Sequence, residues 1–324
     1  MPTITLAQGL NEALRFCMGR DDRVVVMGED VGKAGGVFRI TDKLQQEFGE
    51  QRVIDTPLAE SGIIGTGIGL AIYGFKPVVE MQFDGFTYPA FEQITSHLAK
   101  YRSRTMGKLP LSVVVRIPYG GGIGAVEHHS ESLEAYFTHT AGLKVVTPST
   151  PSDAFALLVD AINDPDPVIF LEPKRRYWIR EEVELPVTNG DRRRARIVRE
   201  GTDVTILTYG PSVRTVEEAA EEAAKDGVQC EVIDLRWLNP LDLETIMASV
   251  RKTGRAVVVT EAPITGSFAG ELAARIAEDD FLSLNAPVIR VGGYDIPYPP
   301  AKVEDLYLPD LDRVLDAVDA VLNY

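Results

Sequence analysis

The first half of the chain alternates short apolar runs with longer segments in which apolar residues recur every three to four positions. The short runs are typical of buried strands, and the periodic segments are typical of helices that pack on a sheet. This pattern predicts strands at 23–28, 77–81, 111–116, 143–146 and 168–171, and helices at 63–73, 88–101 and 152–163. Strands and helices in this alternation indicate a parallel sheet covered on both faces.

A further helix is predicted directly after Thr5. Thr5 and Gln8 have the spacing of a capping box, in which the two side chains and backbone N–H groups of the first turn bond reciprocally. The residues that follow place one apolar face on this helix: Leu6, Leu10, Ala13, Leu14 and Cys17.

A charged segment interrupts the alternation between Lys174 and Asp203. It is rich in arginine, glutamate and turn-forming residues, including Asn189-Gly190, and it lacks apolar periodicity. Such a composition is typical of a connection between domains. The arginines of 192–196 also fit a basic patch, but we prefer to interpret them as the solvated face of a linker.

The alternation of strands and helices resumes after this segment. Strands are predicted at 204–207, 230–233, 256–259 and 287–291, and helices at 212–225, 241–252, 268–278 and 311–322. We therefore predict an α/β protein with two doubly wound domains, of which the second is smaller.

Composition narrows the class of protein. The 324 residues suffice for two domains, and 45% apolar with 25% charged residues is the balance of a soluble globular protein. A net charge of −15 argues against binding to nucleic acid or to an anionic membrane. Cys17 and Cys230 lie far apart without metal-ligand spacing, and the sequence shows neither a secretory signal nor an apolar run of membrane-spanning length. We expect a cytoplasmic enzyme or enzyme subunit.

Glu60 is the first candidate functional residue. It stands at the end of the run Asp55-Thr56-Pro57-Leu58-Ala59-Glu60 and directly before an apolar, glycine-rich segment. A carboxylate that enters an apolar interior is unfavourable unless it is paired or protonated, so Glu60 is a candidate functional acid. On spacing alone, a cap on the following helix, assisted by Ser61, explains Glu60 equally well.

The glycines that follow do not form a nucleotide-binding loop. Gly62, Gly65, Gly67 and Gly69 miss the dinucleotide fingerprint in spacing and fall inside a predicted helix, where small residues allow close backbone packing. The sequence also lacks a P-loop, so the chain alone is not equipped to hold a diphosphate.

A second glycine-rich loop, 119–132, carries His128 and His129. Two adjacent histidines rarely bind the same metal ion, whereas a histidine close to a helix N-terminus, here capped by Ser130, can carry a proton near neutral pH. A loop histidine that simply bonds to backbone groups is the alternative.

These motifs resemble those of β subunits of thiamine-diphosphate-dependent 2-oxo acid dehydrogenases. Residues 55–71 are similar to the segment that activates the cofactor, 127–132 to a His-Ser-Gln loop, and 80–91 to the lining of the aminopyrimidine pocket. The resemblance covers the whole chain. It implies a pyrimidine-binding domain at 1–180, a linker at 181–202 and a transketolase-type C-terminal domain at 203–324.

The resemblance also implies roles for individual residues. Glu60 would share a proton with the aminopyrimidine ring, Leu58 and Gln82 would line its pocket, and Phe86 would stack on it where relatives often have tyrosine. Phe83 and Phe91 fit simple core packing. His129 would orient substrate or manage protons during acyl transfer. Glu131 replaces the usual glutamine, which puts the role of that amide in question.

Cations and partners are implied in the same way. The family holds magnesium and diphosphate through a Gly-Asp-Gly and Asn-Asn motif that this sequence lacks, so an α subunit would supply that half in an assembly of two α and two β chains. Some relatives bind potassium through backbone carbonyls. The matching positions here are Leu111, Val113, Val114, Ala161, Asp164 and Asp166.

The resemblance implies a subunit that decarboxylates a 2-oxo acid and passes the acyl group to lipoyl groups of an acyltransferase component. Segments 172–174, 261–263 and 292–297 resemble the branched-chain type, 3-methyl-2-oxobutanoate dehydrogenase, more than the animal pyruvate type. A pyruvate or acetoin dehydrogenase β subunit is the alternative substrate class. A self-sufficient transketolase-like enzyme and a non-catalytic subunit that tethers the complex are alternatives of other classes.

Overall fold

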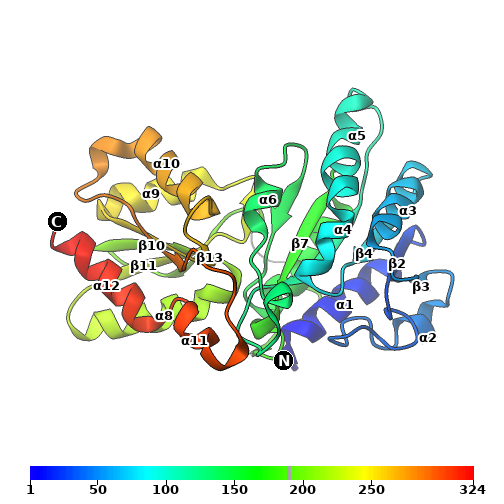
Figure 1. Ribbon diagram of the computed structural model, residues 1–324, viewed down its shortest axis with the longest axis horizontal. Coiled ribbons are helices and arrows are strands. Elements are labelled where there is room, and N and C mark those ends of the chain that lie inside the picture. Colours follow the sequence, from blue (N-terminus) through cyan, green and yellow to red (C-terminus); the bar gives the residue numbers. More distant parts are fainter. Residues whose placement is uncertain (188–190) are drawn as a thin grey trace. The chain divides into compact units, whose positions relative to one another are not determined.

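A computed structural model describes residues 1–187 and 191–324. These residues form two compact units (Figure 1). Unit 1 comprises 1–119 and 136–192, and unit 2 comprises 120–135 and 193–324. The segment 120–135, which carries both histidines of the glycine-rich loop, therefore groups with the second half of the chain.

Unit 1 is built around a parallel sheet with the strand order β6-β7-β5-β4-β2-β3. Its central strands are apolar and fully buried, as a sheet covered on both faces requires. The strands of this unit are β1 (Thr3–Thr5), β2 (Val24–Gly28), β3 (Val53–Asp55), β4 (Lys76–Glu80), β5 (Val114–Tyr119), β6 (Lys144–Val146), β7 (Val168–Pro173) and β8 (Arg180–Glu182).

The helices of unit 1 flank this sheet (Figure 1). The capping box predicted at Thr5 is confirmed, since the Gln8 N–H donates to Thr5 Oγ1 at 3.1 Å and the Thr5 N–H donates to Gln8 Oε1 at 2.8 Å. The helices are α1 (Leu6–Met18), α2 (Leu44–Phe48), α3 (Glu60–Ile72), α4 (Thr87–Glu92), α5 (Ala99–Arg104), α6 (Glu134–Thr138, which begins in unit 2) and α7 (Pro151–Asn163).

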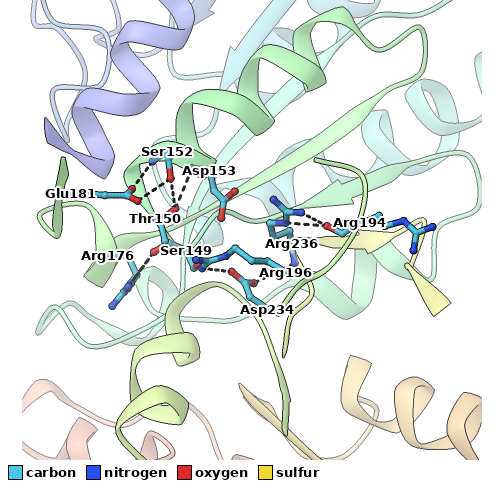
Figure 2. Close-up of polar contacts among 10 residues, drawn as sticks. All are labelled: Ser149, Thr150, Ser152, Asp153, Arg176, Glu181, Arg194, Arg196, Asp234 and Arg236. Atoms are coloured by element: carbon cyan, nitrogen blue, oxygen red, sulfur yellow. Dashed lines mark hydrogen bonds and ion pairs between the residues drawn. The ribbon is translucent and has the colours of Figure 1, made fainter. Parts of the chain in front are cut away.

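Helix α1 packs closely on α7. A Cβ at Gly9 would lie 2.5 Å from the carbonyl oxygen of Pro151, so this crossing requires glycine. The N-terminus of α7 is capped by Thr150, and the Glu181 carboxylate accepts a hydrogen bond of 2.9 Å from the Ser152 N–H (Figure 2). Glu181 belongs to β8, which pairs with β1, so the charged segment after Lys174 begins as a strand.

Unit 2 contains a five-stranded sheet with the order β14-β13-β10-β11-β9, parallel except for β9. Helices α8 and α12 pack on it around a core that includes Val216, Ala220, Val314 and Val318 (Figure 1). The strands are β9 (Arg196–Arg199), β10 (Val204–Thr208), β11 (Cys230–Asp234), β12 (Trp237–Asn239), β13 (Ala256–Pro263) and β14 (Ile289–Gly293), and the helices are α8 (Val213–Lys225), α9 (Leu243–Thr253), α10 (Phe268–Asp280), α11 (Glu304–Tyr307) and α12 (Leu311–Leu322).

The two doubly wound α/β units confirm the predicted fold class. Two local predictions need correction. The helix expected at 88–101 is divided into α4, a π-helical turn over Gln93–Leu98 and α5, and the strand expected to begin at Leu111 begins at Val114. The charged segment 181–202 includes part of β8 and all of β9, while its Asn189-Gly190 lies outside the described residues.

Candidate active site

The carboxyl ends of β2, β3 and β4 bring polar side chains together in unit 1. Glu29 directly follows β2, Asp55 ends β3 and Gln82 lies two residues after β4. Because parallel strands place their carboxyl ends at one edge of the sheet, these residues are neighbours. The Gln82 amide donates hydrogen bonds of 3.3 Å to the Glu29 carbonyl and to the Asp30 carboxylate.

Glu60 lies at this edge as the first residue of α3 and is half-buried. A carboxylate in the first turn is favoured by the helix dipole. Ala59 is the N-cap residue, and it makes no side-chain cap bond within the described part of the chain. Glu60 is thus placed both to favour the start of this helix and to take part in chemistry, and both interpretations stay predictions.

Glu29 is the residue at this edge that sequence reasoning missed. It is buried, and burial together with the charges of Glu60 and Asp30 raises the pKa of its carboxyl above the usual range. Its Oε1 atom has no hydrogen-bond partner among residues 1–187 and 191–324. Its position directly after an apolar strand could have identified Glu29 from the sequence, because a residue there lies at the same edge of the sheet as Glu60.

The loop after Glu29 is fastened by Asp55. The Asp55 carboxylate accepts hydrogen bonds from the N–H groups of Gly32, at 2.6 Å, and Lys33, at 3.1 Å. Asp30 adopts the left-handed conformation with φ of 58°, which is uncommon for a residue other than glycine. The carboxylate of Asp55 thus holds the backbone beside Glu29.

Two of the residues expected to bind the aminopyrimidine, Gln82 and Phe86, lie beside or within a short 3₁₀ turn over Asp84–Phe86. Phe86 and Gln82 are half-buried, and Leu58 is 81% exposed. Phe86 contacts Phe83 edge-on, and Phe83, which is half-buried, in turn contacts Phe38. Phe91 likewise packs on Tyr136 and Phe137.

A buried ion pair fixes this turn. The Lys174 ammonium lies 2.6 Å from the Asp84 carboxylate, and both side chains are fully buried. Lys174 Nζ also lies 5.6 Å from the centre of the Phe83 ring. Asp84 opens the turn that carries Phe86, so the pair anchors the start of that turn. Local sequence patterns do not indicate this pairing, because the two residues are 90 positions apart.

The loop Gly120–Glu131, hereafter the His129 loop, lies in unit 2. Its base is closed by a hydrogen bond of 2.9 Å from the Gly120 N–H to the Glu131 carbonyl. Glu127–His129 forms a 3₁₀ turn, in which His128 is exposed and His129 is half-buried. The prediction that Ser130 caps a helix is wrong, because its hydroxyl donates to the Val126 carbonyl and α6 begins only at Glu134.

The positions proposed for potassium lie together in unit 1. The carbonyls of Leu111, Val113 and Ala161 accept hydrogen bonds from the N–H groups of Val113, Val168 and Asp164. Val114 begins β5. Lys144 pairs with Asp164 at 2.7 Å and with Asp166 at 3.0 Å. The described residues contain no group of three or more histidine, cysteine or acidic side chains placed for a metal, and a carbonyl-bound potassium stays a prediction.

The arginines after residue 191 are engaged within the protein rather than forming a basic patch. In unit 1, Arg192 pairs with Asp160 at 2.9 Å. In unit 2, Arg196 pairs with Asp234 at 3.2 Å, and Arg236 donates to the Arg194 carbonyl (Figure 2). Arg194 itself pairs with Glu244. This segment is therefore held by specific contacts within the described part of the chain.

The edge of unit 1 suits a polar heterocycle such as an aminopyrimidine. It offers the half-buried carboxyl group of Glu60, the buried Glu29 with its Oε1 atom unbonded within the described chain, and an aromatic side chain on a fixed turn. A carboxyl with a raised pKa can donate to a ring nitrogen, and an aromatic face can stack on the ring. None of the helices in the described ranges is long and apolar enough to cross a membrane.

Comparison with known proteins identifies the domains of this chain. The family model described as "Transketolase, pyrimidine binding domain" matches residues 2–178, and "Transketolase, C-terminal domain" matches residues 193–314. The split-gene transketolase structure described as an inactive β4 tetramer superposes with a TM-score of 0.82 at 23% identity, covering 99% of this chain and 98% of the other. This similarity shows a shared fold.

Relatives of known name align over nearly the full chain. The pyruvate dehydrogenase E1 component subunit beta of Leifsonia xyli subsp. xyli is 53% identical, covering 99% of this chain and 96% of the relative. The 3-methyl-2-oxobutanoate dehydrogenase subunit beta of Mycobacterium tuberculosis is 54% identical, covering 99% and 92%. The chain therefore belongs to the transketolase-like E1 β subunits of thiamine-diphosphate-dependent 2-oxo acid dehydrogenases.

Proposed function

We propose that this chain, paired with an α subunit, takes part in the oxidative decarboxylation of a 2-oxo acid and the transfer of its acyl group to lipoyl groups of an acyltransferase component. Thiamine diphosphate, when bound with magnesium, supplies the stabilisation of the carbanion that decarboxylation needs. This chain would hold the aminopyrimidine through Leu58, Gln82 and Phe86.

The observation that carries this proposal is the proximity of Glu29 and Glu60. Burial and the charge of Glu60 raise the pKa of the Glu29 carboxyl above its usual range, so this edge of the sheet retains a proton more readily than an exposed carboxyl does. Glu60, the first residue of α3, matches the family's activating acid by sequence resemblance. It would hold a proton at the ring nitrogen of the aminopyrimidine, and the buried Glu29 would lie beside it.

A glutamine variant of Glu60 tests this role. Glu60→Gln keeps the shape of the side chain but cannot give up a proton, so deuterium exchange at the thiazolium carbon should slow about 10²- to 10⁴-fold. Binding of thiamine diphosphate and pairing with the α subunit should persist. Glu50→Gln, at an exposed position away from the site, is the matched control. Near-normal exchange and turnover in Glu60→Gln would favour the non-catalytic tethering subunit.

The need for an α subunit is supported by the surface of unit 1. Leu58, Ile72, Tyr73 and Tyr88 are large apolar residues that are at least 44% exposed, and they lie on or beside α3 and α4. Such exposure is typical of a surface that an obligate partner covers. The sequence also lacks a diphosphate-binding motif. We therefore expect an assembly of two α and two β chains.

The isolated chain tests this requirement. Alone, it should bind thiamine diphosphate weakly or not at all, because the α subunit would supply the groups for diphosphate and magnesium. Calorimetric titration of the cofactor into the chain, and then into the reconstituted pair, separates the two cases. Tight, magnesium-dependent binding by the chain alone would instead indicate a self-sufficient transketolase-like enzyme.

For the substrate, we propose a branched-chain 2-oxo acid such as 3-methyl-2-oxobutanoate. The mycobacterial relative of that name is 54% identical, and residues 172–174, 261–263 and 292–297 resemble the branched-chain type. Pyruvate is the second candidate, since the relative from Leifsonia is 53% identical. The ratio of kcat/KM for the two acids, measured on the reconstituted pair, decides between them.

We assign His129, rather than His128, to acyl transfer. His129 is half-buried within a closed loop, whereas His128 is exposed. His129→Ala should reduce acylation of a free lipoyl domain more than it reduces thermal stability, because a loop residue contributes little core packing. His128→Ala should be mild. Equal losses of stability and activity in both variants would indicate that the histidines only support the loop.

A further inference from the structure

The His129 loop is held by carboxylates from the last third of the chain. Gly120, Gly122 and Gly124 have positive φ angles of 81°, 82° and 71°. Positive φ angles are accessible to glycine, and their recurrence at every second residue turns several backbone N–H groups toward one side. The loop therefore forms a small concave surface of N–H donors, of the kind that binds anions.

The anions bound there are side chains of unit 2 itself. The Glu304 carboxylate accepts hydrogen bonds from the N–H groups of Gly124, at 2.8 Å, and Gly122, at 3.2 Å. The Glu261 carboxylate accepts one from the Gly121 N–H at 3.2 Å. Glu304 is buried at the start of α11, and Glu261 is buried in β13.

Tyr298 completes this contact. Its hydroxyl donates to Glu304 at 2.8 Å and accepts from the Gly122 N–H at 3.2 Å. Burial, together with the hydrogen bond to Glu304, raises the pKa of the Tyr298 hydroxyl above its usual range. A Cβ at Gly121 would overlap the Tyr298 hydroxyl. The loop can therefore approach Tyr298 and Glu304 only with glycine at 121.

The glycine half of the loop leads directly into the segment that carries the histidines. Within that segment, the N–H groups of His129 and Ser130 donate to the carbonyls of Val126 and Glu127, and the Ser130 hydroxyl donates to the Val126 carbonyl. The 3₁₀ turn with His129 begins three residues after Gly124. Hydrogen bonds to a charged carboxylate are about twice as strong as neutral ones, and Glu304 accepts two of them from the glycine half of the loop.

We propose that Glu304, with Tyr298, is a positioning residue for acyl transfer, because it fixes the His129 loop from a site 180 residues away in the sequence. This inference rests on the proposed role of His129. Glu304 does not touch the reacting groups in this proposal. It sets the conformation from which His129 acts on the lipoyl group.

The first measurement is kinetic and uses the chain reconstituted with its α subunit. Glu304→Gln retains the size of the side chain but replaces one acceptor oxygen with an NH₂ group that faces the loop N–H groups. The kcat/KM for a free lipoyl domain should fall about 10- to 100-fold, as expected for a misplaced catalytic group. Deuterium exchange at the thiazolium carbon, which depends on Glu60, should keep its wild-type rate.

Two further variants separate positioning from folding. Tyr298→Phe removes one hydroxyl and should reduce the same kcat/KM less than Glu304→Gln does. Asp295→Asn is the control, because Asp295 lies in the same segment but is exposed and bonds to Thr265. In the double variant Glu304→Gln/His129→Ala, the loss of kcat/KM should not exceed that of His129→Ala alone, since both changes affect the same function, that of His129.

A structural measurement accompanies the kinetics. Hydrogen–deuterium exchange of the peptide covering the His129 loop should speed up in Glu304→Gln and stay unchanged in Asp295→Asn. Wild-type lipoyl acylation in Glu304→Gln, or losses that multiply in the double variant, would overturn the proposal. Absence of lipoyl acylation by the wild-type pair would instead overturn the proposed function, so the two failures are distinguishable.

Discussion

The buried pair of Lys174 and Asp84 leads to the sharpest prediction about stability in unit 1. Lys174→Met keeps the length of the side chain but removes its charge. The Asp84 carboxylate, fully buried, then loses an ammonium group that lies 2.6 Å away. Because Asp84 opens the turn over Asp84–Phe86, the change should also loosen the position of Phe86.

The expected loss of stability follows from the burial of both partners. Removing one member of a buried ion pair costs about 3–5 kcal/mol of unfolding free energy, because the remaining charge stays buried and loses the attraction of its partner. At about 1.4 kcal/mol per factor of ten, the unfolding equilibrium constant should rise roughly a hundred- to several-thousandfold. Replacing both partners by neutral groups avoids the buried charge, so Lys174→Met/Asp84→Asn should recover much of the loss.

Chemical denaturation followed by circular dichroism measures this cycle on the purified chain. The control is Lys225→Met, since Lys225 forms an exposed pair with Glu222 on α8 and its loss should leave the midpoint unchanged. A shift in Lys174→Met no larger than that of the control would refute the reasoning. So would a double variant that is less stable than Lys174→Met, because the uncompensated charge could not then be the cause.

Three further predictions follow from individual contacts. The pKa of Glu29 is raised in the folded chain, so its contribution to stability is fully present below pH about 4.5 and is lost as the pH rises through the folded pKa. Glu29→Gln should therefore reduce the fall in stability between pH 4.5 and 7, and an unchanged pH profile would contradict this. Thr5→Ala should remove the capping box of α1 and cost about 0.5–2 kcal/mol in denaturant unfolding, with Thr202→Ala, at an exposed position, as control. A potassium ion bound at the carbonyls of 111–114 and 161–166 should raise the thermal midpoint in potassium chloride above that in equal sodium chloride, and equal midpoints would speak against the site.

Local patterns predicted those parts of the fold whose causes are local. The capping box at Thr5 and Gln8 involves residues three positions apart, and it forms as the sequence indicates. The apolar strands at 24–28 and 168–173 lie within two residues of their predicted ends, because burial on both faces leaves a continuous apolar run. The glycines of 62–69 fall inside α3 as expected, and a Cβ at Gly67 would press on Val79.

The parts that could not be predicted depend on partners far away in the sequence. Strand β9 lies in a segment without apolar periodicity, and it forms because β11 offers an edge with which it pairs. No sequence pattern in the predicted helix 88–101 indicates the π-helical turn at 93–98. The hydrogen bonds from Gly122 and Gly124 to Glu304 join residues about 180 positions apart. Glycine spacing predicted a loop there, but not which carboxylates hold it.

The carboxyl groups of this acidic chain differ in the charges that surround them, and this difference identifies the candidate acid better than burial does. Glu80 is as buried as Glu29, and burial raises the pKa of both. Glu80, however, lies 2.6 Å from the guanidinium of Arg116, which favours its charged form and commits it to a structural ion pair. The charges beside Glu29 are those of Glu60 and Asp30, which oppose ionisation. Glu29 therefore has a reason to retain a proton that a paired carboxyl such as Glu80 lacks, and this is why the edge of β2 and β3 is our candidate for acid–base chemistry.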